Sequence, residues 1–447
     1  MKNNQIFSCS NCGAQFQKWV GRCLECGKWG TIDDKPQIQI TKKQNNTENY
    51  ALTSLSTLSS IKSENAARIK TNVNELDRVL GGGFVPGSLI LLGGEPGIGK
   101  STLALQLSSI FAHTLYLSGE ESIEQIKIRS ERLKINSPTL QIGNETNVEK
   151  IVATIRKIKP PMAIVDSIQT ISSNEAEGEA GNITQVRACT VKLMEAAKTT
   201  GTTIILVGQV TKEGSVAGPK SLEHLVDMVL YLEGDRFHQF RILRAAKNRF
   251  GSTDEVGVFS MEENGLQEVK NPSAAFLNER SENPAGNVIA CLMEGSRPIL
   301  IEIQALVNKT SFGYPVRKAS GFDLNRLHVL IAVLQKRAGL HLEQFDVHLN
   351  IVGGLTANEP AADLAVAMAV VGAYKDKPLG TDLAAFGEIG LSGEIRPVSF
   401  TEKRLKECEQ LGLKRVITNL GNQNKPTKIK SLKVIGIKNI QDIIKHT

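Results

Sequence analysis

Residues 94–101, GEPGIGKS, fit the pattern G-x-x-x-x-G-K-[ST], in which a glycine-rich loop binds phosphate groups. A bound phosphate needs backbone N–H groups that point at it, and glycine lets the backbone bend where a Cβ would intrude. Lys100 would reach the β- and γ-phosphates, and the Ser101 hydroxyl would bind Mg²⁺. The expected site for ATP and Mg²⁺ consists of Gly94, Glu95, Pro96, Gly97, Ile98, Gly99, Lys100, Ser101 and Thr102.

Cysteines near the N-terminus form a second group of residues that could bind a ligand. Four of the seven cysteines have the spacing C-x2-C-x10-C-x2-C, and a glycine follows the second cysteine of each pair. Two such pairs can bring four thiolates around a tetrahedral Zn²⁺, which leaves no position for water and makes the zinc structural. Disulfides are the weaker alternative in a reducing compartment. The expected zinc ligands are Cys9, Cys12, Cys23 and Cys26.

Strand and helix patterns alternate around the phosphate-binding loop. The apolar run 88–92 predicts a buried strand before the loop, and residues 101–112 have the spacing of a helix after it. This succession continues and builds a parallel sheet flanked by helices, an α/β fold. The further predicted elements are strands at 114–118, 162–168 and 202–210, and helices at 121–133, 147–159 and 183–200.

Carboxylates follow two of these strands. Asp166 ends an apolar strand, a position from which a carboxylate reaches the Mg²⁺ shell. Glu120 and Glu121 follow the strand after the loop's helix, where a carboxylate could polarise the attacking water. Capping of a helix N-terminus is the alternative role for Glu121.

Length and composition indicate a soluble protein of two or three domains, because 447 residues exceed one ordinary domain. Hydrophobic residues make up 41% and charged residues 22% of the chain. The sequence has no apolar run of about 18 residues, so we expect neither a transmembrane helix nor a membrane partner. The first residues lack the apolar core of a secretory signal, which predicts a cytoplasmic location.

Two stretches differ from the rest in composition. Residues 33–62 are polar, rich in Asn, Thr and Ser and weakly periodic, which predicts a linker. Residues 401–447 hold 11 Lys and Arg against 4 Asp and Glu, an excess equal to the net charge of +7. Such a region indicates either an anionic partner such as nucleic acid or a solvated helix face.

Four longer stretches carry a resemblance to a known family. LGGGFVPGSLILLGGEPGIGKSTL, YLSGEES, VTKEGSVAGPKSLEHLVD and LRAAKNRFGSTDEVGVFSM are similar to segments of the bacterial RadA (Sms) family of recombination and repair ATPases. The zinc module and the C-terminal segment match in the same order, so the resemblance covers nearly the whole chain. It implies a RecA-like core, a hexameric ring similar to replicative helicases, and DNA-dependent ATP hydrolysis that promotes branch migration. The implied partners are single-stranded DNA, branched recombination intermediates and a RecA-like recombinase.

The resemblance also implies roles for single residues. Glu120 would activate the water, and Gln209 would sense the γ-phosphate at a site where related sequences usually carry His. Lys247 and Arg249 of the KNRFG signature would reach the γ-phosphate of a neighbouring subunit or bind DNA. A solvated run of charge is the alternative for this pair.

Two loops would contact DNA by the same resemblance. The first, 167–182, is acidic, which is unfavourable beside phosphates. The second is 211–220. We therefore expect the DNA contacts to come from Lys212, Lys220, Lys247 and Arg249. The zinc module would bind DNA or a protein through the residues that surround it, Lys18, Trp19, Arg22, Lys28 and Trp29.

The C-terminal part resembles the proteolytic domain of Lon. Residues 345–355 alternate as a half-buried strand and residues 361–375 form an apolar helix. Lon-type cleavage needs a Ser activated by a Lys. The Ser position falls on Ala361 and the Lys position on Glu402, and Lys403 is displaced by one helical residue, about 100°. We therefore expect a domain that cuts nothing and that serves as a scaffold with a DNA-facing surface.

The expected organisation has four parts: a zinc finger at 1–32, a linker at 33–62, a RecA-like ATPase domain at 63–270 and a Lon-protease-like α+β domain at 271–447. Three functions compete. They are a DNA-dependent ATPase of homologous recombination, an ATP-dependent protease, and a clock-type signalling ATPase that acts on proteins without DNA. The KNRFG signature joined to a Lon-like domain favours the first.

Overall fold

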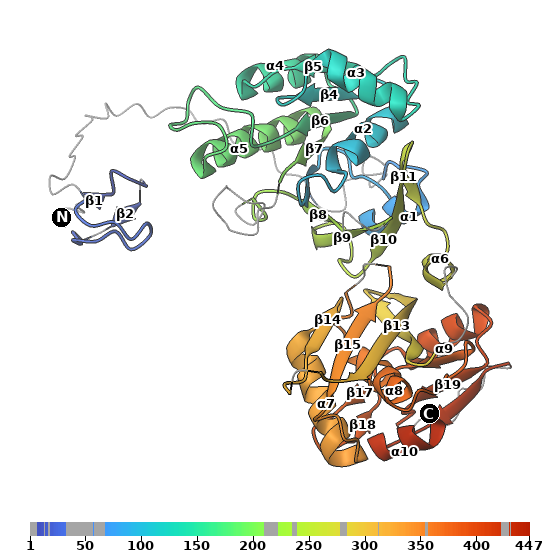
Figure 1. Ribbon diagram of the computed structural model, residues 1–447. Coiled ribbons are helices and arrows are strands. Elements are labelled where there is room, and N and C mark those ends of the chain that lie inside the picture. Colours follow the sequence, from blue (N-terminus) through green and yellow to red (C-terminus); the bar gives the residue numbers. More distant parts are fainter. Residues whose placement is uncertain are drawn as a thin grey trace. The chain divides into compact units, whose positions relative to one another are not determined.

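The chain forms two compact units, Met1–Lys62 and Ser63–Thr447 (Figure 1). The computed structural model describes residues 7–12, 14–16, 18–32, 57, 68–209, 222–234, 239–277, 284–311, 313–353, 356–421, 429 and 431–447. The predicted DNA-binding loop 211–220, with Lys212 and Lys220, lies outside the described residues, as does almost all of the predicted linker.

The first unit contains a small ribbon. Strands β1 (Phe7–Ser8) and β2 (Gln15–Phe16) pair antiparallel, and single bridges join Cys9 to Ile32 and Arg22 to Trp29. Its core is small: the hydrophobic residues that are buried in the described part of the ribbon are Cys9, Cys23 and Ile32. A core of this size does not stabilise a fold alone, so the ribbon depends on a metal ion bound by its cysteines.

A nine-stranded sheet forms the ATPase part of the second unit, with the order β11-β10-β9-β8-β3-β7-β6-β4-β5. The strands from β8 to β5 are parallel, whereas β8 to β11 pair antiparallel. The strands are β3 (Leu89–Gly94), β4 (Leu115–Ser118), β5 (Gln141–Asn144), β6 (Met162–Asp166), β7 (Thr203–Val207), β8 (Met228–Glu233), β9 (Phe240–Asn248), β10 (Val256–Glu262) and β11 (Gly265–Glu268).

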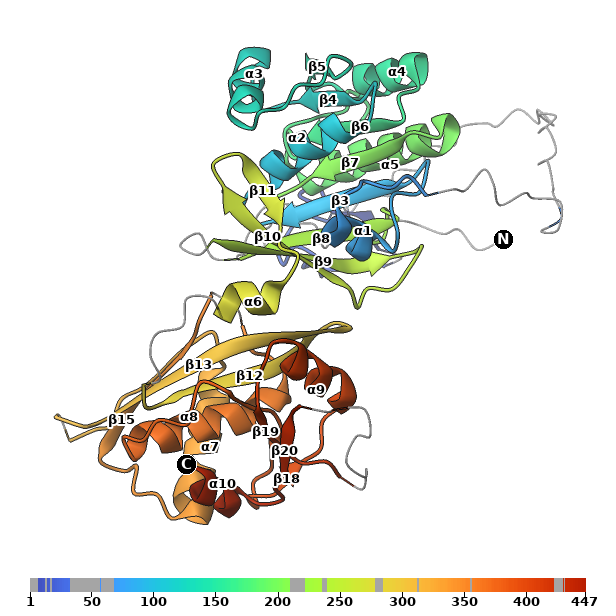
Figure 2. The ribbon, with the colours of Figure 1, turned by 90° about the vertical axis from the view of Figure 1, so that its right-hand side faces the viewer.

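Helices cover both faces of this sheet (Figure 2). Alternate residues of β3 point to opposite faces. Ile90 and Leu92 pack with one helical group, and Leu89 and Leu91 with the other. The first group is α1 (Asn74–Leu80), α2 (Lys100–Ile110) and α3 (Ile123–Arg132); the second is α4 (Val148–Ile158) and α5 (Ile183–Thr200). The predicted α/β sandwich is confirmed, and helix 183–200 has the predicted bounds. The short strand β5, at the sheet edge, was not predicted.

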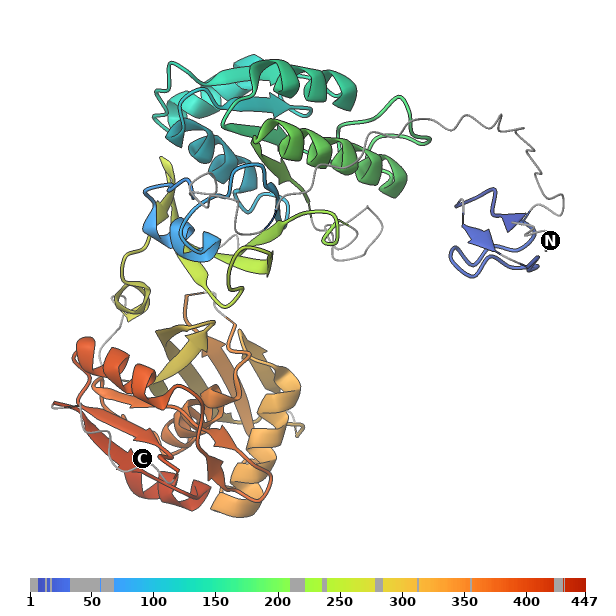
Figure 3. The ribbon, with the colours of Figure 1, turned by 180° about the vertical axis from the view of Figure 1, so that it is seen from behind.

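The C-terminal domain, yellow to red in Figure 3, is built on a seven-stranded mixed sheet with the order β14-β15-β13-β12-β16-β19-β20. Its strands are β12 (Asn287–Glu294), β13 (Arg297–Lys309), β14 (Arg317–Ser320), β15 (Phe345–Ile351), β16 (Leu383–Ala385), β19 (Arg415–Thr418) and β20 (Lys433–Gly436). A separate hairpin pairs β17 (Glu388–Ile389) with β18 (Ile395–Arg396).

One helix of this domain lies inside the core. Every residue of α8 (Asp363–Tyr374) from Asp363 to Gly372 is buried, and its Ala and Val side chains let the sheet approach closely. The other helices are α6 (Pro272–Leu277), α7 (Leu324–Ala338), α9 (Thr401–Gln410), α10 (Ile440–His446) and the 3-10 turn η4 (Pro360–Ala362). Among the described residues, no helix has both the length and the apolar character that a membrane span needs.

Candidate functional site

The phosphate-binding loop connects β3 to α2, as the sequence predicts. Gly94, Gly97 and Gly99 have φ values of +153°, +77° and +114°, in the region that favours glycine. A Cβ at Gly94 would lie 2.5 Å from the Leu232 carbonyl oxygen, which a side chain does not tolerate. Helix α2 begins at Lys100, so its first N–H groups face the loop and favour an anion there.

A cavity of ≈ 270 Å³ opens beside this helix end. Its position at the carboxyl ends of parallel strands is where open α/β sheets bind ligands. The Lys100 ammonium points into this region and donates to the carbonyl oxygens of Gly94 (2.9 Å) and Glu95 (2.8 Å). Burial lowers the pKa of Lys100, whereas the negative charges of Asp166 and Glu120 raise it. The cavity is lined by Pro96, Gly97, Gly99, Lys100, Ser101, Thr102, Glu120, Arg129, Arg132, Asp166, Ser167, Val207 and Gln209.

Oxygen atoms suited to Mg²⁺ meet at the same place. Asp166 ends β6, is buried, and accepts a hydrogen bond from the Tyr116 hydroxyl at 2.5 Å. Burial raises the pKa of Asp166, and hydrogen bonds from Tyr116 and Ser101 lower it. Glu120 accepts a hydrogen bond from the Ser167 hydroxyl. Hydroxyl and carboxylate oxygens are the ligands that Mg²⁺ prefers, so this donor set fits the ion.

Two charged side chains of the cavity wall were not predicted from the sequence. Arg129 and Arg132 lie one turn apart on α3. Arg129 pairs with Glu121 through Nη2, while its Nη1 is buried without a hydrogen-bond partner among the described residues. The spacing R-x-x-R on a helix that begins at the site is the signal that could have found both arginines.

The alternative role of Glu121 is wrong. Ser122 caps α3: its hydroxyl accepts from the Gln125 N–H, and the Gln125 side chain accepts from the Ser122 N–H. Glu121 instead forms the ion pair with Arg129. Burial raises the pKa of Glu121 and Arg129 opposes this shift.

Gln209 follows β7 and lines the cavity, whereas Lys247 and Arg249 do not line it. Lys247 donates to the carbonyl oxygens of Glu223 (2.5 Å) and Val226 (2.9 Å). Burial, followed by the charge of Arg249, lowers the pKa of Lys247. Arg249 lies 3.4 Å from Asp227 and its side chain is 55% exposed. Both cations of the KNRFG signature are therefore tied to the segment 222–227.

The four cysteines of the ribbon are arranged as a zinc site requires. Their Sγ atoms lie within 4.8 Å of one another, with 3.5 Å between Cys12 and Cys23 and 3.8 Å between Cys9 and Cys26. Tetrahedral Zn²⁺ with Zn–S bonds of about 2.3 Å separates its sulfurs by about 3.8 Å. Gly27 has φ +72°, as a turn after a ligand pair needs. The cluster fits zinc.

The residue at the expected position of the Lon-type serine, Ala361, carries no nucleophile. Ala361 is buried in η4, and the neighbouring Glu359 forms an ion pair with Arg404, whose side chain is fully buried. Arg404 also donates to the Cys291 carbonyl oxygen at 2.6 Å. The Lys403 ammonium donates a hydrogen bond to the Ser296 carbonyl oxygen at 3.4 Å.

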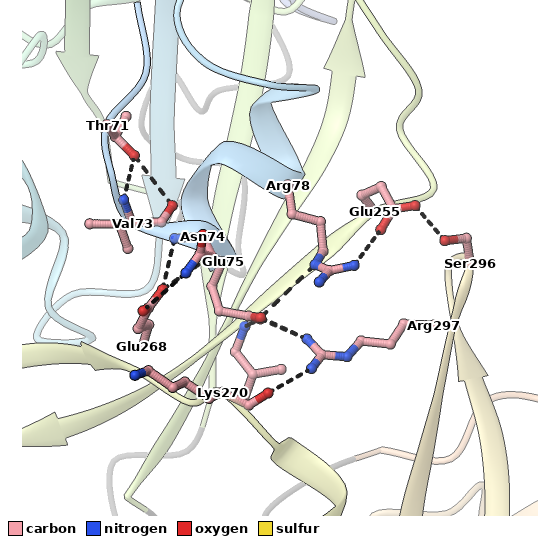
Figure 4. Close-up of polar contacts among 11 residues, drawn as sticks. Thr71, Val73, Asn74, Glu75, Arg78, Glu255, Glu268, Lys270, Ser296 and Arg297 are labelled. Atoms are coloured by element: carbon pink, nitrogen blue, oxygen red, sulfur yellow. Dashed lines mark hydrogen bonds and ion pairs between the residues drawn. The ribbon is translucent and has the colours of Figure 1, made fainter. Parts of the chain in front are cut away.

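A polar junction joins the ATPase part to the C-terminal domain (Figure 4). Arg297, the first residue of β13, donates from Nη1 to both carboxylate oxygens of Glu75, at 2.9 and 2.8 Å. Glu75 lies on α1, and its carboxylate also accepts from the Val258 N–H at 2.9 Å. The buried carboxylate of Glu75 therefore connects α1 and β10 of the ATPase part with the first residue of β13 in the C-terminal domain.

The turn between β12 and β13 adds further contacts. The Ser296 N–H donates to the Asp254 carbonyl oxygen at 2.8 Å, and Arg244 pairs with Glu294 at 2.8 Å. Gly295 has φ +64°, and a Cβ there would lie 1.3 Å from the Asp254 oxygen. Since Asp254 follows Arg249 by five residues, this turn braces the loop that carries the KNRFG signature.

A phosphate-binding loop after β3, a carboxylate at the end of β6 and the parallel order β8-β3-β7-β6-β4 define a P-loop ATPase with a RecA-like core. Family comparison matches an AAA domain at residues 56–215, a rubredoxin metal binding domain at 7–34 and the Lon protease (S16) C-terminal proteolytic domain at 331–447. The cofactors are therefore ATP with Mg²⁺, and zinc in the ribbon.

Full-length relatives identify the family. The chain is 47% identical to the DNA repair protein RadA of Bacillus subtilis (strain 168), covering 99% of this chain and 98% of that protein. It is 46% identical to that of Listeria monocytogenes serovar 1/2a, with the same coverage. The crystal structure of the RadB recombinase covers 45% of this chain and 99% of its own, at 23% identity and a TM-score of 0.37. The chain belongs to the family of the DNA repair protein RadA.

Proposed function

We propose that this chain is a DNA-dependent ATPase of homologous recombination and DNA repair, which acts as a hexameric ring on single-stranded DNA and promotes branch migration. The observation that carries the proposal is the anchoring of Lys247. Its ammonium holds the backbone of Glu223 and Val226. This segment lies shortly after residues 211–220 in the chain, where we expect a DNA-binding loop with Lys212 and Lys220.

The same anchoring supports a physical link between DNA and hydrolysis. Arg249 pairs with Asp227 and is half-exposed, so a neighbouring subunit can reach it. A cation supplied across a subunit boundary stabilises the charge that develops during phosphoryl transfer. DNA bound to residues 211–220 would hold the neighbouring segment 222–227, and with it the positions of Lys247 and Arg249. Hydrolysis in the next subunit would then follow DNA binding.

Within one subunit, each residue of the cavity has a separate role in ATP hydrolysis. Lys100 exchanges its bonds to the Gly94 and Glu95 carbonyls for bonds to the β- and γ-phosphates. Ser101 and Asp166 would hold Mg²⁺, which would neutralise phosphate charge there. Glu120, fixed by the Ser167 hydroxyl, orients the attacking water and accepts its proton. Gln209 senses the γ-phosphate from the end of β7.

We further propose that residues 63–270 form the motor and that the Lon-like domain, 271–447, is a proteolytically inactive scaffold with a basic surface. Ala361 carries no oxygen to attack a carbonyl, and Glu359, two residues before it, is bound in an ion pair to Arg404. The partners are single-stranded DNA, branched recombination intermediates and a RecA-like recombinase.

ATP hydrolysis with and without single-stranded DNA tests this function. We expect DNA to stimulate the wild-type protein, and Arg249→Ala to lose the stimulation while still binding nucleotide. Arg156→Ala, an exposed arginine on α4, is the matched control and should respond as the wild type does. ATP hydrolysis that is indifferent to DNA would favour the signalling ATPase, and ATP-dependent cleavage of casein would favour the protease.

Subunit mixing tests the role across the interface. Rings of Lys100→Ala alone or Arg249→Ala alone have no complete site. In a ring, each site would take Lys100 from one subunit and Arg249 from the next, because every ring contact is heterologous. In a one-to-one mixture each residue is intact in half of the subunits, so about a quarter of the sites have both. Activity should therefore recover to about that fraction. A mixture that stays as inactive as its components at every ratio would contradict the role of Arg249 in trans.

A further inference from the structure

The zinc ribbon exposes both tryptophans of the chain. The sequence contains two tryptophans, and the side chains of Trp19 and Trp29 are 53% and 75% exposed. Indole rings carry a large apolar surface, and proteins ordinarily bury most of it. Two exposed indoles on a ribbon of this size therefore mark a surface that another molecule covers.

The two indoles flank the same backbone position. A Cβ at Gly21 would lie 3.7 Å from Cη2 of Trp19 and 3.9 Å from Cζ3 of Trp29. The six-membered rings of both residues thus border the space above Gly21, which has no side chain to fill it. We call this arrangement the tryptophan slot: Trp19, Gly21 and Trp29.

The backbone of the ribbon holds the slot in place. Arg22 and Trp29 form an antiparallel bridge, and the Gly30 N–H donates to the Gly21 carbonyl oxygen at 3.0 Å. The Trp19 Nε1–H donates to the Ile32 carbonyl oxygen at 3.4 Å. Trp19 and Gly21 precede the second pair of zinc ligands, Cys23 and Cys26, and Trp29 follows it. Metal binding at this pair would therefore hold both rings in place.

Positive charge borders the slot. Lys18, Arg22 and Lys28 are exposed, and between residues 18 and 32 a single acidic residue, Glu25, opposes them. The Arg22 guanidinium lies 5.9 Å from the centre of the Trp29 ring, and its Nε donates to the Gly27 carbonyl oxygen at 2.8 Å. A cation beside an aromatic face suits a ligand that offers both a flat ring and an anion.

We propose that the tryptophan slot stacks unpaired bases of single-stranded DNA while Lys18 and Arg22 contact the adjacent phosphates. Single strands present base faces, which duplex DNA hides in its stack, and aromatic platforms flanked by cations bind them with little sequence preference. The proposal rests on the proposed function in taking DNA as the partner. It adds a second DNA contact, on a unit separate from the ATPase.

Tryptophan fluorescence of the full-length protein measures this contact directly, because both indoles of the chain are in the ribbon. Titration with an oligo(dT) strand should quench the emission and saturate, whereas a blunt duplex should leave it nearly unchanged. Trp29→Ala should weaken oligo(dT) binding by roughly 5-fold to 150-fold, the range expected for one stacked base. Zinc content and ATP hydrolysis without DNA should be unaffected.

Two control variants distinguish ring stacking from nonspecific apolar binding. Trp29→Phe keeps an aromatic face and should retain most of the affinity. Leu24→Ala removes an apolar side chain that is equally exposed, at 76%, but has no ring, and should bind as the wild type does. Equal losses in Trp29→Ala and Leu24→Ala would overturn stacking.

The result also distinguishes this proposal from the function on which it rests. DNA-stimulated hydrolysis with unchanged tryptophan emission and unchanged affinity in Trp29→Ala would refute the slot and leave the DNA-dependent ATPase standing. Quenching by a RecA-like recombinase but not by oligo(dT) would assign the slot to a protein and overturn the proposal. Absence of both DNA binding and DNA stimulation would overturn both.

Discussion

The Glu75–Arg297 pair supports a quantitative prediction. The Glu75 side chain is 4% exposed and that of Arg297 is 16% exposed. Arg297→Ala removes two charge-assisted hydrogen bonds and leaves the Glu75 carboxylate with the Val258 N–H and with Arg78 at 3.9 Å. Loss of one partner of a buried pair costs about 3–5 kcal/mol. Since Arg78 remains near and Arg297 is not fully buried, we expect the stability of the junction to fall by about 2–4 kcal/mol.

Urea unfolding, followed by a double-mutant cycle, measures this cost. Glu75→Ala with Arg297→Ala should cost less than the sum of the single variants, with a coupling free energy of roughly 2 kcal/mol, because neither charge is left unpaired. Arg396→Ala is the matched control, since Arg396 pairs with Glu388 and Glu394 while 56% exposed. Exposed pairs contribute about 0–1 kcal/mol.

The junction also predicts a functional effect. Because the turn after β12 contacts Asp254, Arg297→Ala should reduce DNA-stimulated hydrolysis while the affinity for nucleotide stays unchanged. If Arg297→Ala is no more destabilising than Arg396→Ala, or if the two junction substitutions are additive, the reasoning fails.

Three further outcomes are expected. Lys100→Ala should abolish ATP hydrolysis, because the positive charge that Lys100 offers to the γ-phosphate is lost. Phosphate release at the wild-type rate would contradict the site. Cys9→Ser should release zinc, since three thiolates bind it less tightly than four, while the circular dichroism of the ATPase part persists; one zinc per chain in the purified variant by atomic emission would argue against the ligand set. Ala361→Ser should not restore cleavage of casein, because the expected Lys position holds Glu402 and no lysine is there to activate the new hydroxyl; ATP-dependent cleavage by this variant would show that the dyad site is still competent.

The sequence predicts the local parts of the site well. The loop from Gly94 to Ser101 depends on glycine spacing, and the strand that ends at Asp166 depends on a continuous apolar run. Both signals are contained in a few neighbouring residues. Helix α5 has its predicted bounds because Asn182 caps its start and Gly201 ends it.

Several contacts between residues far apart in the chain were not predicted. Arg297 and Glu75 are separated by 222 positions, and no local pattern relates them. Tyr116 reaches Asp166 because β4 and β6 are neighbours in the sheet, a pairing that strand prediction does not supply. Strand β5 escaped prediction because it is polar and half-exposed at the sheet edge, where burial imposes little pattern on a strand.

Strand β13 has a mechanical consequence for the domain that it crosses. It runs for 13 residues, from Arg297 at the junction to Lys309 beside Phe345. At about 3.3 Å per residue, its length is roughly 40 Å. With Arg297 as the fulcrum, a rotation of about 10° at the ATPase part would carry Lys309 through about 7 Å, as the same length dictates. Because β13 is bonded to β12 and β15, a small change of angle at the Glu75–Arg297 pair would move the whole sheet and give its largest displacement at the Lys309 end.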